Sequence, residues 1–392
     1  MVHVCEWHAA RYSQTVNNIS IPYPKLPPDV AAVDDMAEHM SRLTRIADML
    51  VIAGQNTIRH RRFDADVYAT ALENGRNIEN DPALRQQLGM TGQGEITKVI
   101  DFPCIITDRK GRILCWYLPE VLDQATQECT LRGFNQLRPE LQKASGIPVD
   151  SVRKPTITWR RDAQYFRPKN TCLIPPGILT FAPVWHMPGF SPPKHAPVEG
   201  AAWRDFRKTD RWPRWVDELH DLMWAMFTVA SICHPRQLAA YNGSLNSLRE
   251  SGPTFEEAYA NWQWPGHGLA LISNRQTPFH RDRKTAIGMY DIIATCGRYA
   301  DGDFAIEELG IRLRYKPGTL INIAGGMLRH AAEVGEGERV AAVCFMREEL
   351  MEATETAIPF LTDMEHRLTD IEGWIVPDTE SQPDDGASNH SQ

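Results

Sequence analysis

Short apolar runs separated by turn residues fill the last third of the chain. The runs cover residues 268–273, 286–295, 311–314, 319–323 and 339–346, with turn residues at 316–318 and 325–326 among those between them. Evenly spaced short strands with turn signals between them are typical of an antiparallel sandwich or jelly roll. We therefore predict an α+β fold with a double-stranded β-helix (jelly-roll) core at residues 261–350.

Apolar residues at helical spacing precede this block. The residues Val33, Met36, Met40, Leu43, Ile46 and Leu50 recur every three or four positions, which predicts a helix that ends at Gly54. Similar patterns predict helices near 64–73, 121–137 and 215–231. Residues 98–118 read as a hairpin that belongs either to the main sheet or to a flanking platform. Asn242-Gly243 and Ser251-Gly-Pro253 indicate loops within 241–260.

Five segments follow from these patterns. We expect an extended, Pro-rich N-terminal arm (1–30), a helical and hairpin flanking region (31–150), a basic aromatic stretch with a support helix (151–260), the jelly roll (261–350) and an acidic C-terminal tail (351–392), with the part from Pro377 on disordered.

The overall composition is that of a soluble globular protein, with 42% hydrophobic and 23% charged residues among 392. No apolar run approaches the roughly 18 residues of a membrane span, and no secretory signal is evident. Eight cysteines occur singly, without a C-x-x-C pair, so we expect reduced thiols and no structural zinc. The cluster Arg59-His60-Arg61-Arg62 is either a nuclear-import signal or a solvated helix end. We expect an intracellular and nuclear protein.

Charge is unevenly distributed along the chain. The net charge is −8, but residues 351–392 hold ten acidic residues and one arginine, which leaves the rest at about +1. Residues 151–214 hold twelve Lys or Arg against four Asp or Glu. The local charge of such a segment, and not the net charge of the chain, determines whether a polyanionic partner is attracted.

The same segment interleaves its cations with aromatic rings. Two interpretations stay open: the cations contact phosphate while the rings stack on an unpaired base, or the rings anchor a Pro-rich loop whose cations are solvated. On the first interpretation, candidate substrate-binding residues are Arg160, Arg161, Arg207 and Lys208.

Three residues within the strand block form a candidate metal site. His280 and Asp282 are two apart and project to the same face of a strand, and His330 on a neighbouring strand can complete the set. Two histidines and one carboxylate on one side of a metal are typical of non-haem iron(II) oxygenases. The open positions on the ion can take a 2-oxo acid and dioxygen.

Arginines near this triad provide candidate anchors for the 2-oxo acid. Arg339 opens the strand after His330, and its planar fork can pair with the distal carboxylate of 2-oxoglutarate. Asn274 and Arg275, upstream of His280, are candidates for the cofactor carboxylate or for the edge of a base. We assign Asn274 to the cofactor and Arg275 to the substrate.

The residues around these positions carry a family resemblance. Segments 274–282, 303–312, 315–318 and 328–330, together with the hairpin at 105–113, resemble the fungal TET/JBP-like dioxygenases that depend on iron(II) and 2-oxoglutarate. The animal enzymes carry a Cys-rich zinc-binding region that this chain lacks. The resemblance implies oxidation of a methylated base in DNA by methyl hydroxylation, with 5-methylcytosine as the expected base and 6-methyladenine as a further candidate.

Two other function classes compete with this one. The same iron site would serve a hydroxylase of a small molecule or of a protein side chain. A metal-binding or inactive homologue is disfavoured because His280, Asp282, His330 and Arg339 are all present.

Overall fold

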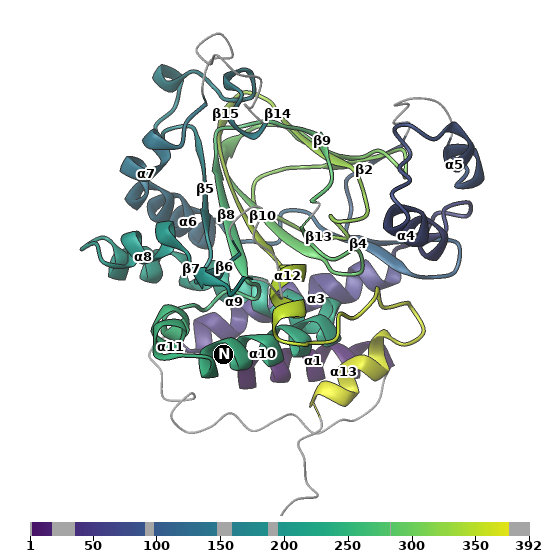
Figure 1. Cartoon of the computed structure of the whole chain (residues 1–392). Helices are drawn as coiled ribbons and strands as arrows, with labels where there is room; N and C mark the ends of the chain where they lie inside the picture. The colour runs from purple at the N-terminus through teal and green to yellow at the C-terminus, as the bar shows by residue number, and fades with distance from the viewer. Residues whose placement is uncertain are drawn as a thin grey trace, which may run out of the picture.

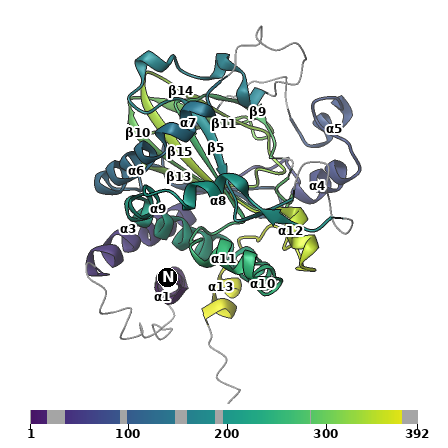
Figure 2. The same cartoon turned by 60° about the vertical axis from the view of Figure 1, so that its left-hand side comes forward.

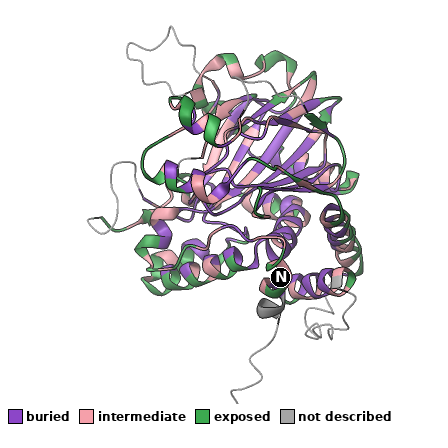
Figure 3. Ribbon diagram, turned by 90° about the vertical axis from the view of Figure 1, so that its right-hand side faces the viewer, coloured by how far each residue is buried: buried purple, intermediate pink, exposed green. Residues whose placement is uncertain are grey.

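Two β-sheets face each other, and helices cover the outer face of the larger sheet (Figures 1 and 2). The computed structural model describes residues 2–17, 36–90, 98–146, 159–186, 195–282 and 284–375. Buried residues concentrate on the sheets and on the helix sides that face them (Figure 3).

The eight strands of the last third divide equally between the two sheets. Neighbouring strands run in the order β13-β10-β15-β8 in the large sheet and β12-β11-β14-β9 in the small one, all antiparallel. This topology is the predicted jelly roll. The strands are β8 (Gly268–Ser273), β9 (Thr277–His280), β10 (Asp291–Tyr299), β11 (Gly302–Ile306), β12 (Ile311–Arg314), β13 (Thr319–Ile323), β14 (His330–Val334) and β15 (Gly337–Phe345).

Strands from earlier in the chain widen both sheets. The hairpin joins the large sheet, with β4 (Ile113–Leu118) beside β13, then β3 (Cys104–Thr107) and β1 (Thr57–Arg59). Strand β2 (Lys98–Ile100) extends the small sheet, and β5 (Gly177–Phe181) extends the large sheet beside β8. The question left open for the hairpin is therefore decided: it belongs mainly to the large sheet. Strands β6 (Val184–Trp185) and β7 (Val198–Glu199) pair separately.

The helices supply the flanking layers. The layer on the large sheet includes α3, α6 and α9, and α1, α10 and α13 lie farther out (Figure 1). The helices are α1 (Val2–Asn17), α3 (Met36–Gln55), α4 (Ala65–Glu73), α5 (Pro82–Gln87), α6 (Gln124–Gln136), α7 (Arg138–Lys143), α8 (Ala201–Arg207), α9 (Trp212–Cys233), α10 (Pro235–Glu250), α11 (Pro253–Ala260), α12 (Glu348–Ala353) and α13 (Arg367–Ile375), with short 3-10 turns η2 (Trp159–Arg161), η3 (Ala163–Tyr165) and η4 (Lys169–Thr171).

Two predictions about local structure were wrong. Residues 2–17 form a helix and not an extended arm, because Val4, Ala9 and Tyr12 are buried at helical spacing against neighbouring helices. Residues 241–260 are mostly helical, not loops. Pro235 and Pro253 each stand in the first turn of a helix, where a missing N–H costs nothing.

Part of the predicted acidic tail is folded, since α12 and α13 lie within it. The rest of the N-terminal arm from residue 18 and the tail from residue 376 lie outside the described residues. Among the described helices, none is long and apolar enough to cross a membrane.

Candidate functional site

Adjacent strands of the small sheet bring the three predicted metal ligands together. His280 is the last residue of β9, His330 is the first of β14, and the two are partners in the strand register. Asp282 lies in the following turn, where its N–H donates to the Gly325 carbonyl at 2.9 Å. The Nε2 atoms of His280 and His330 each lie 3.5 Å from an Asp282 oxygen. One ligand atom from each residue can thus reach a single ion.

Hydrogen bonds fix the orientation of both imidazole rings. Nδ1 of His280 lies 3.0 Å from the Pro278 carbonyl, and Nδ1 of His330 lies 3.0 Å from the Leu328 carbonyl. A proton on each Nδ1 leaves the Nε2 lone pairs directed at Asp282. Burial lowers the pKa of His330 to about 4, which keeps its ring neutral and able to bind metal. Two imidazoles and one carboxylate fit iron(II).

A second carboxyl group, that of Asp291, lies close to Asp282. Asp291, at the start of β10, is fully buried, and Thr285 Oγ1 donates to its Oδ1 at 3.0 Å. Burial and the charge of Asp282 raise the pKa of Asp291 well above its usual range, which favours the neutral carboxyl group beside Asp282. A Cβ at Gly325 would stand 2.1 Å from Asp291 Oδ2, so glycine is required there. Asp291 was not assigned from the sequence, because neighbouring strand residues face opposite ways and the spacing does not show which one points into the cavity.

Arg339 is buried at one end of the site with its guanidinium held on three sides. It donates to Thr295 Oγ1 at 3.1 Å, to the Arg275 carbonyl at 3.0 Å and to the Tyr315 hydroxyl at 3.1 Å. Five N–H donors leave two for a ligand. This geometry suits the predicted carboxylate contact, because the fork is already oriented.

Arg275 places a second buried guanidinium nearby. Its Nε and Nη2 atoms have no hydrogen-bond partner among the described residues, and the group stacks 4.8 Å from the Trp159 ring centre. Burial and the charges of Arg160 and Arg339 lower the pKa of Arg275 to about 10. Unpaired buried cations are costly, so this pair is prepared for an anion.

Asn274 does not line the cavity, and its assignment to the cofactor was wrong. Its Oδ1 accepts from the Arg339 N–H at 3.0 Å, its own N–H donates to the Arg339 carbonyl at 2.8 Å, and its Nδ2 donates to the Ile174 carbonyl. The residue adopts φ 49°, a left-handed conformation that asparagine tolerates. Asn274 therefore fixes the backbone that presents Arg339.

The turn η2 lies across the metal ligands. The Trp159 ring centre is 4.6 Å from that of His280, and Arg160 Nη2 is 3.4 Å from Asp282 Oδ1. Arg160 also stacks on Trp159 at 4.4 Å. Arg161, the next residue, is exposed and does not line the cavity. Of this predicted cationic pair, the structure brings only Arg160 to the site.

Arg207 and Lys208 lie elsewhere, at the end of α8. The Arg207 side chain is 10% exposed and pairs with Glu199 at 3.2 Å and with Glu257 at 3.1 Å. Its assignment as a substrate contact is corrected, because its charge is neutralised inside the fold. Lys208 is exposed and also lies outside the cavity.

A cavity of about 790 Å³ runs between the sheets and contains the triad. Side chains along a strand point alternately to the two faces of the sheet, and those of the large sheet that point inward form the floor of the cavity. They include Ile178, Ile272, Ile293 and Val343. Arg339 and Arg275 lie at one end of this floor. The other end has aromatic and cationic walls formed by Trp185, Phe345, Arg347 and Lys284.

We call Trp185, Phe345 and Arg347 the distal lobe. Arg347 follows Arg339 by eight residues, roughly 26 Å along an extended strand. Its guanidinium lies 3.8 Å from the centre of the Trp185 ring and 5.2 Å from that of Phe345. Burial lowers the pKa of Arg347 to about 10. This group was not predicted from the sequence, although Arg339, Val343, Phe345 and Arg347 lie at alternate positions along β15 and just beyond its end.

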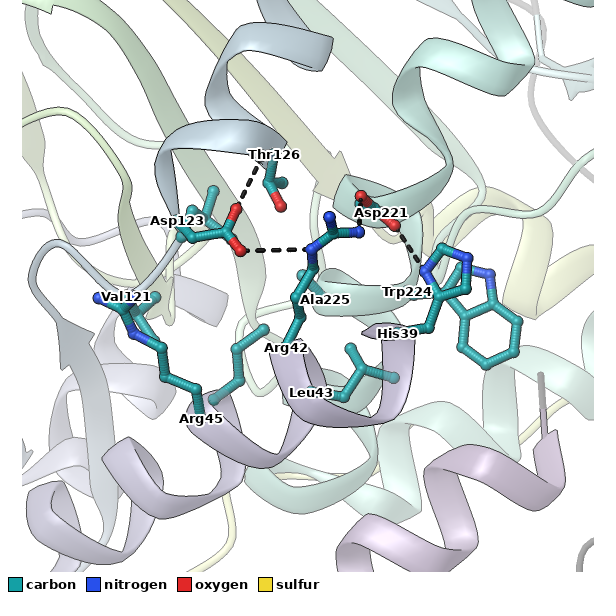
Figure 4. Close-up of a pocket in the computed structure, with 12 residues that line it drawn as sticks. His39, Arg42, Leu43, Arg45, Val121, Asp123, Thr126, Asp221, Trp224 and Ala225 are labelled. Atoms are coloured by element: carbon teal, nitrogen blue, oxygen red, sulfur yellow. Dashed lines mark hydrogen bonds and ion pairs between the residues drawn. The ribbon is translucent and has the colours of Figure 1, made fainter. Parts of the chain in front are cut away.

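A second His and Asp cluster lies between α3 and α9 (Figure 4). His39 Nδ1 is 2.7 Å from Asp221 Oδ1, and His220 Nε2 accepts from Trp224 at 2.7 Å. Arg42 pairs with the other Asp221 oxygen at 2.6 Å, so the carboxylate already has a cation. We interpret this cluster as a helix junction and not as a metal site.

The family comparison agrees with this geometry. Residues 198–348 match the model of the Tet_JBP family, the oxygenase domain of the 2OGFeDO superfamily. The match does not separate fungal members from others. No curated protein matched. Among solved structures, the chain is similar to NgTET1 in complex with 5mC DNA, with 13% identity, a TM-score of 0.46, and coverage of 85% of this chain and 98% of that chain.

The matched residues include all three metal ligands, both guanidiniums at the Arg339 end and the residue Arg347. Members of this superfamily depend on iron(II) and 2-oxoglutarate. The chain carries a Tet_JBP oxygenase domain and is a 2-oxoglutarate- and iron(II)-dependent dioxygenase.

Proposed function

We propose that this dioxygenase oxidises the methyl group of a methylated base in DNA, and that the base is 5-methylcytosine. The observation that carries the proposal is the long cavity. It has an arginine pair for a dicarboxylate at one end, the His280, Asp282 and His330 triad on its wall, and a separate aromatic lobe at the other end. A volume of about 790 Å³ is within the range of sites that bury a drug-sized ligand, so it offers room for both a cofactor and a base.

The triad would hold iron(II), with which 2-oxoglutarate and dioxygen supply the oxidising power for methyl hydroxylation. Arg339 binds the distal carboxylate through its two remaining N–H groups, and Arg275 adds a second cation. The apolar floor excludes water between the two ends of the cavity. Asn274 keeps the Arg339 strand in register while the cofactor enters.

The distal lobe suits a planar base. Arg347 lies over one face of Trp185, Phe345 adds a second ring, and the guanidinium N–H groups are donors for the edge of a base in the lobe. Cytosine presents two adjacent acceptors, N3 and O2, which a guanidinium can contact together. Adenine presents a ring nitrogen next to a donor on that edge. This difference supports 5-methylcytosine over 6-methyladenine.

A base inside a duplex must leave the stack to enter the lobe, at a cost of a few kcal/mol. Arg160 and Lys284 line the cavity with side chains 44% and 46% exposed, and Arg161 is exposed beside them. These cations are suited to the phosphates of an extruded nucleotide. The nuclear location stays a prediction from the sequence.

Mass spectrometry of nucleosides tests the proposal. The protein is incubated with iron(II), 2-oxoglutarate and duplexes that carry 5-methylcytosine, 6-methyladenine or no methyl group. We expect 5-hydroxymethylcytosine, and none from a variant with His280→Ala and Asp282→Ala. Oxidation of 6-methyladenine alone would overturn the choice of base. Uncoupled 2-oxoglutarate turnover without any modified nucleoside would favour a small-molecule or protein hydroxylase.

A further inference from the structure

A buried hydrogen-bond network joins helix α4 to the segments that carry the metal ligands. The Tyr68 hydroxyl donates to Glu308 Oε1 at 3.0 Å and accepts from Arg281 Nη1 at 2.6 Å. Glu308 Oε2 accepts from the main-chain N–H of Arg329 at 2.7 Å. Glu308 itself lies in the turn between β11 and β12. Four segments far apart in sequence therefore meet at one glutamate.

The two arginines of this network stand directly beside metal ligands. Arg281 lies between His280 and Asp282, and Arg329 precedes His330. Neighbouring Cα atoms are joined by rigid peptide units about 3.8 Å long, so a shift of either arginine moves a ligand. Whatever holds Arg281 and Arg329 in place also sets the distance between the ligands.

Glu79 ties the two arginines to each other. Its Oε1 lies 3.6 Å from Arg281 Nη2 and 3.0 Å from Arg329 Nε. Glu307 makes a further ion pair with Arg329. Both ligand segments are thus fixed by one acidic group from the α4 to α5 connection, outside the jelly roll.

Helix α4 is itself firmly attached. Its N-cap Asp64 accepts from the Val67 N–H at 3.2 Å and from Arg109 Nε at 2.8 Å, and Asp108 Oδ2 accepts from the Ala65 N–H at 2.9 Å. The helix is therefore joined to the hairpin turn of the large sheet. It can act as a fixed support rather than as a loose flap.

Burial makes the network sensitive to a single lost partner. The Glu308 side chain is fully buried, and burial raises its pKa to about 7. A carboxyl group in this environment depends on the donors that Tyr68 and Arg329 provide. Removing one donor therefore shifts the Glu308 carboxyl group and with it the other contacts that this group makes.

We propose that Tyr68 and Glu308 are positioning residues for the metal ligands, and that α4 is the support through which they act. The inference rests on the metal site of the proposed function. If Tyr68 positions the metal ligands, helix α4, which precedes the jelly roll in the chain, contributes to the reaction. The alternative is that the network only attaches α4 to the barrel.

Mn²⁺ binding to the metal-free protein, followed by electron paramagnetic resonance of the free ion, separates the two roles. Tyr68→Phe removes the hydroxyl and keeps the ring, which packs against Phe63 at 5.6 Å. We expect about tenfold weaker Mn²⁺ binding, the lower end of the range for partners that orient metal ligands. The visible absorption of Co²⁺-loaded protein should change as well, because it reports ligand geometry.

Tyr241→Phe is the matched control. Tyr241 is also buried, and its hydroxyl donates to the Trp264 carbonyl at 2.9 Å, away from the ligands. It should lose stability comparably while Mn²⁺ affinity and the Co²⁺ spectrum stay unchanged. Equal effects of both variants on metal binding, or parental affinity in Tyr68→Phe, would overturn the positioning role.

Glu308→Gln decides the matter if Tyr68→Phe does not fold. An amide has one acceptor atom and cannot accept from both Tyr68 and the Arg329 N–H, so Mn²⁺ affinity should fall again. Unchanged affinity would contradict the proposal. If the parent and the His280→Ala, Asp282→Ala variant bind Mn²⁺ equally, the metal site fails and the positioning role with it.

Discussion

The two described parts of the basic aromatic stretch have similar compositions, but their aromatic side chains occupy different places in the fold. In residues 159–186, Trp159, Arg160 and Trp185 line the cavity. In residues 195–215, Trp203, Phe206 and Trp215 are buried, with Trp203 and Trp215 both packing against Trp212. The first part contributes to the site, and the second builds the core under α8 and α9.

The difference follows from secondary structure. In the second part the rings recur at helical spacing and face the core together, while Arg207 and Arg211 are paired with glutamates. In the first part, short turns and strand ends leave the rings at the edge of the cavity. Mixed cations and rings thus do not identify a nucleic-acid surface until the spacing of the rings is considered.

Trp203→Ala should produce the largest effect on stability. A fully buried tryptophan leaves a large cavity when truncated, so we expect a loss of about 3 to 5 kcal/mol in the free energy of unfolding. Urea denaturation measures it. Trp159→Ala is the comparison, since its ring is only partly buried and should cost far less. Equal losses would mean that the two parts are packed alike.

Acid should destabilise the core beyond this packed part next. Burial lowers the pKa of His234 and His267 to about 3, against about 6.5 in the unfolded chain. At these two histidines, unfolding therefore takes up two protons between these values. Their contribution to stability is complete above pH 6.5 and falls by about 2 to 3 kcal/mol per pH unit below it.

His234→Phe tests the acid prediction. Neither His234 ring nitrogen has a hydrogen-bond partner among the described residues, and the ring packs against Tyr290. Phenylalanine should reduce the slope by about 1.4 kcal/mol per pH unit. Denaturation curves at pH 7, 6 and 5 measure both slopes. An unchanged slope would assign the acid sensitivity to other groups.

Arg339→Ala and Arg207→Ala compare two guanidiniums. That of Arg339 has N–H groups left for a ligand, whereas that of Arg207 is paired with glutamates inside the fold. Losing a charge-assisted bidentate contact should weaken 2-oxoglutarate binding by about 1.5 to 3 kcal/mol, roughly 10- to 150-fold. Lysine should restore only part of it, because it lacks the planar fork. Titration of 2-oxoglutarate into Mn²⁺-loaded protein measures the change. Arg207→Ala should lower stability without altering this affinity.

Arg161→Glu should have the smallest effect. If Arg161 contacts one phosphate, the slope of log affinity against log salt should fall by about 0.9 on duplex DNA. Lys208→Glu, an equally exposed cation on the packed part, should leave the slope unchanged. Fluorescence anisotropy at several salt concentrations measures both. Identical slopes in the two variants would remove the proposed distinction between the parts.

Much of the site was predictable because it depends on short-range rules. The spacing of His280 and Asp282 places both at one strand end, His330 opens β14, and Arg339 lies near the start of β15. Asn274 and Arg207 were misassigned, because a polar side chain can face a neighbouring backbone or an ion-pair partner instead of the cavity. The assignment of exposed Lys208 to the substrate stays a prediction. Only the register shows that Asn274 contacts Arg339.

By itself, the sequence determined the jelly roll and predicted which residues form the candidate metal triad and which arginine would bind the cofactor. Periodicity and ligand spacing are local properties, which the chain carries in any context. Tertiary structure decided which aromatic rings reach the cavity, that Arg347 meets Trp185, and that Tyr68 supports the H-x-D turn from some 210 positions away. Those contacts join residues of distant segments, and only the packing of sheets and helices brings their side chains within bonding distance.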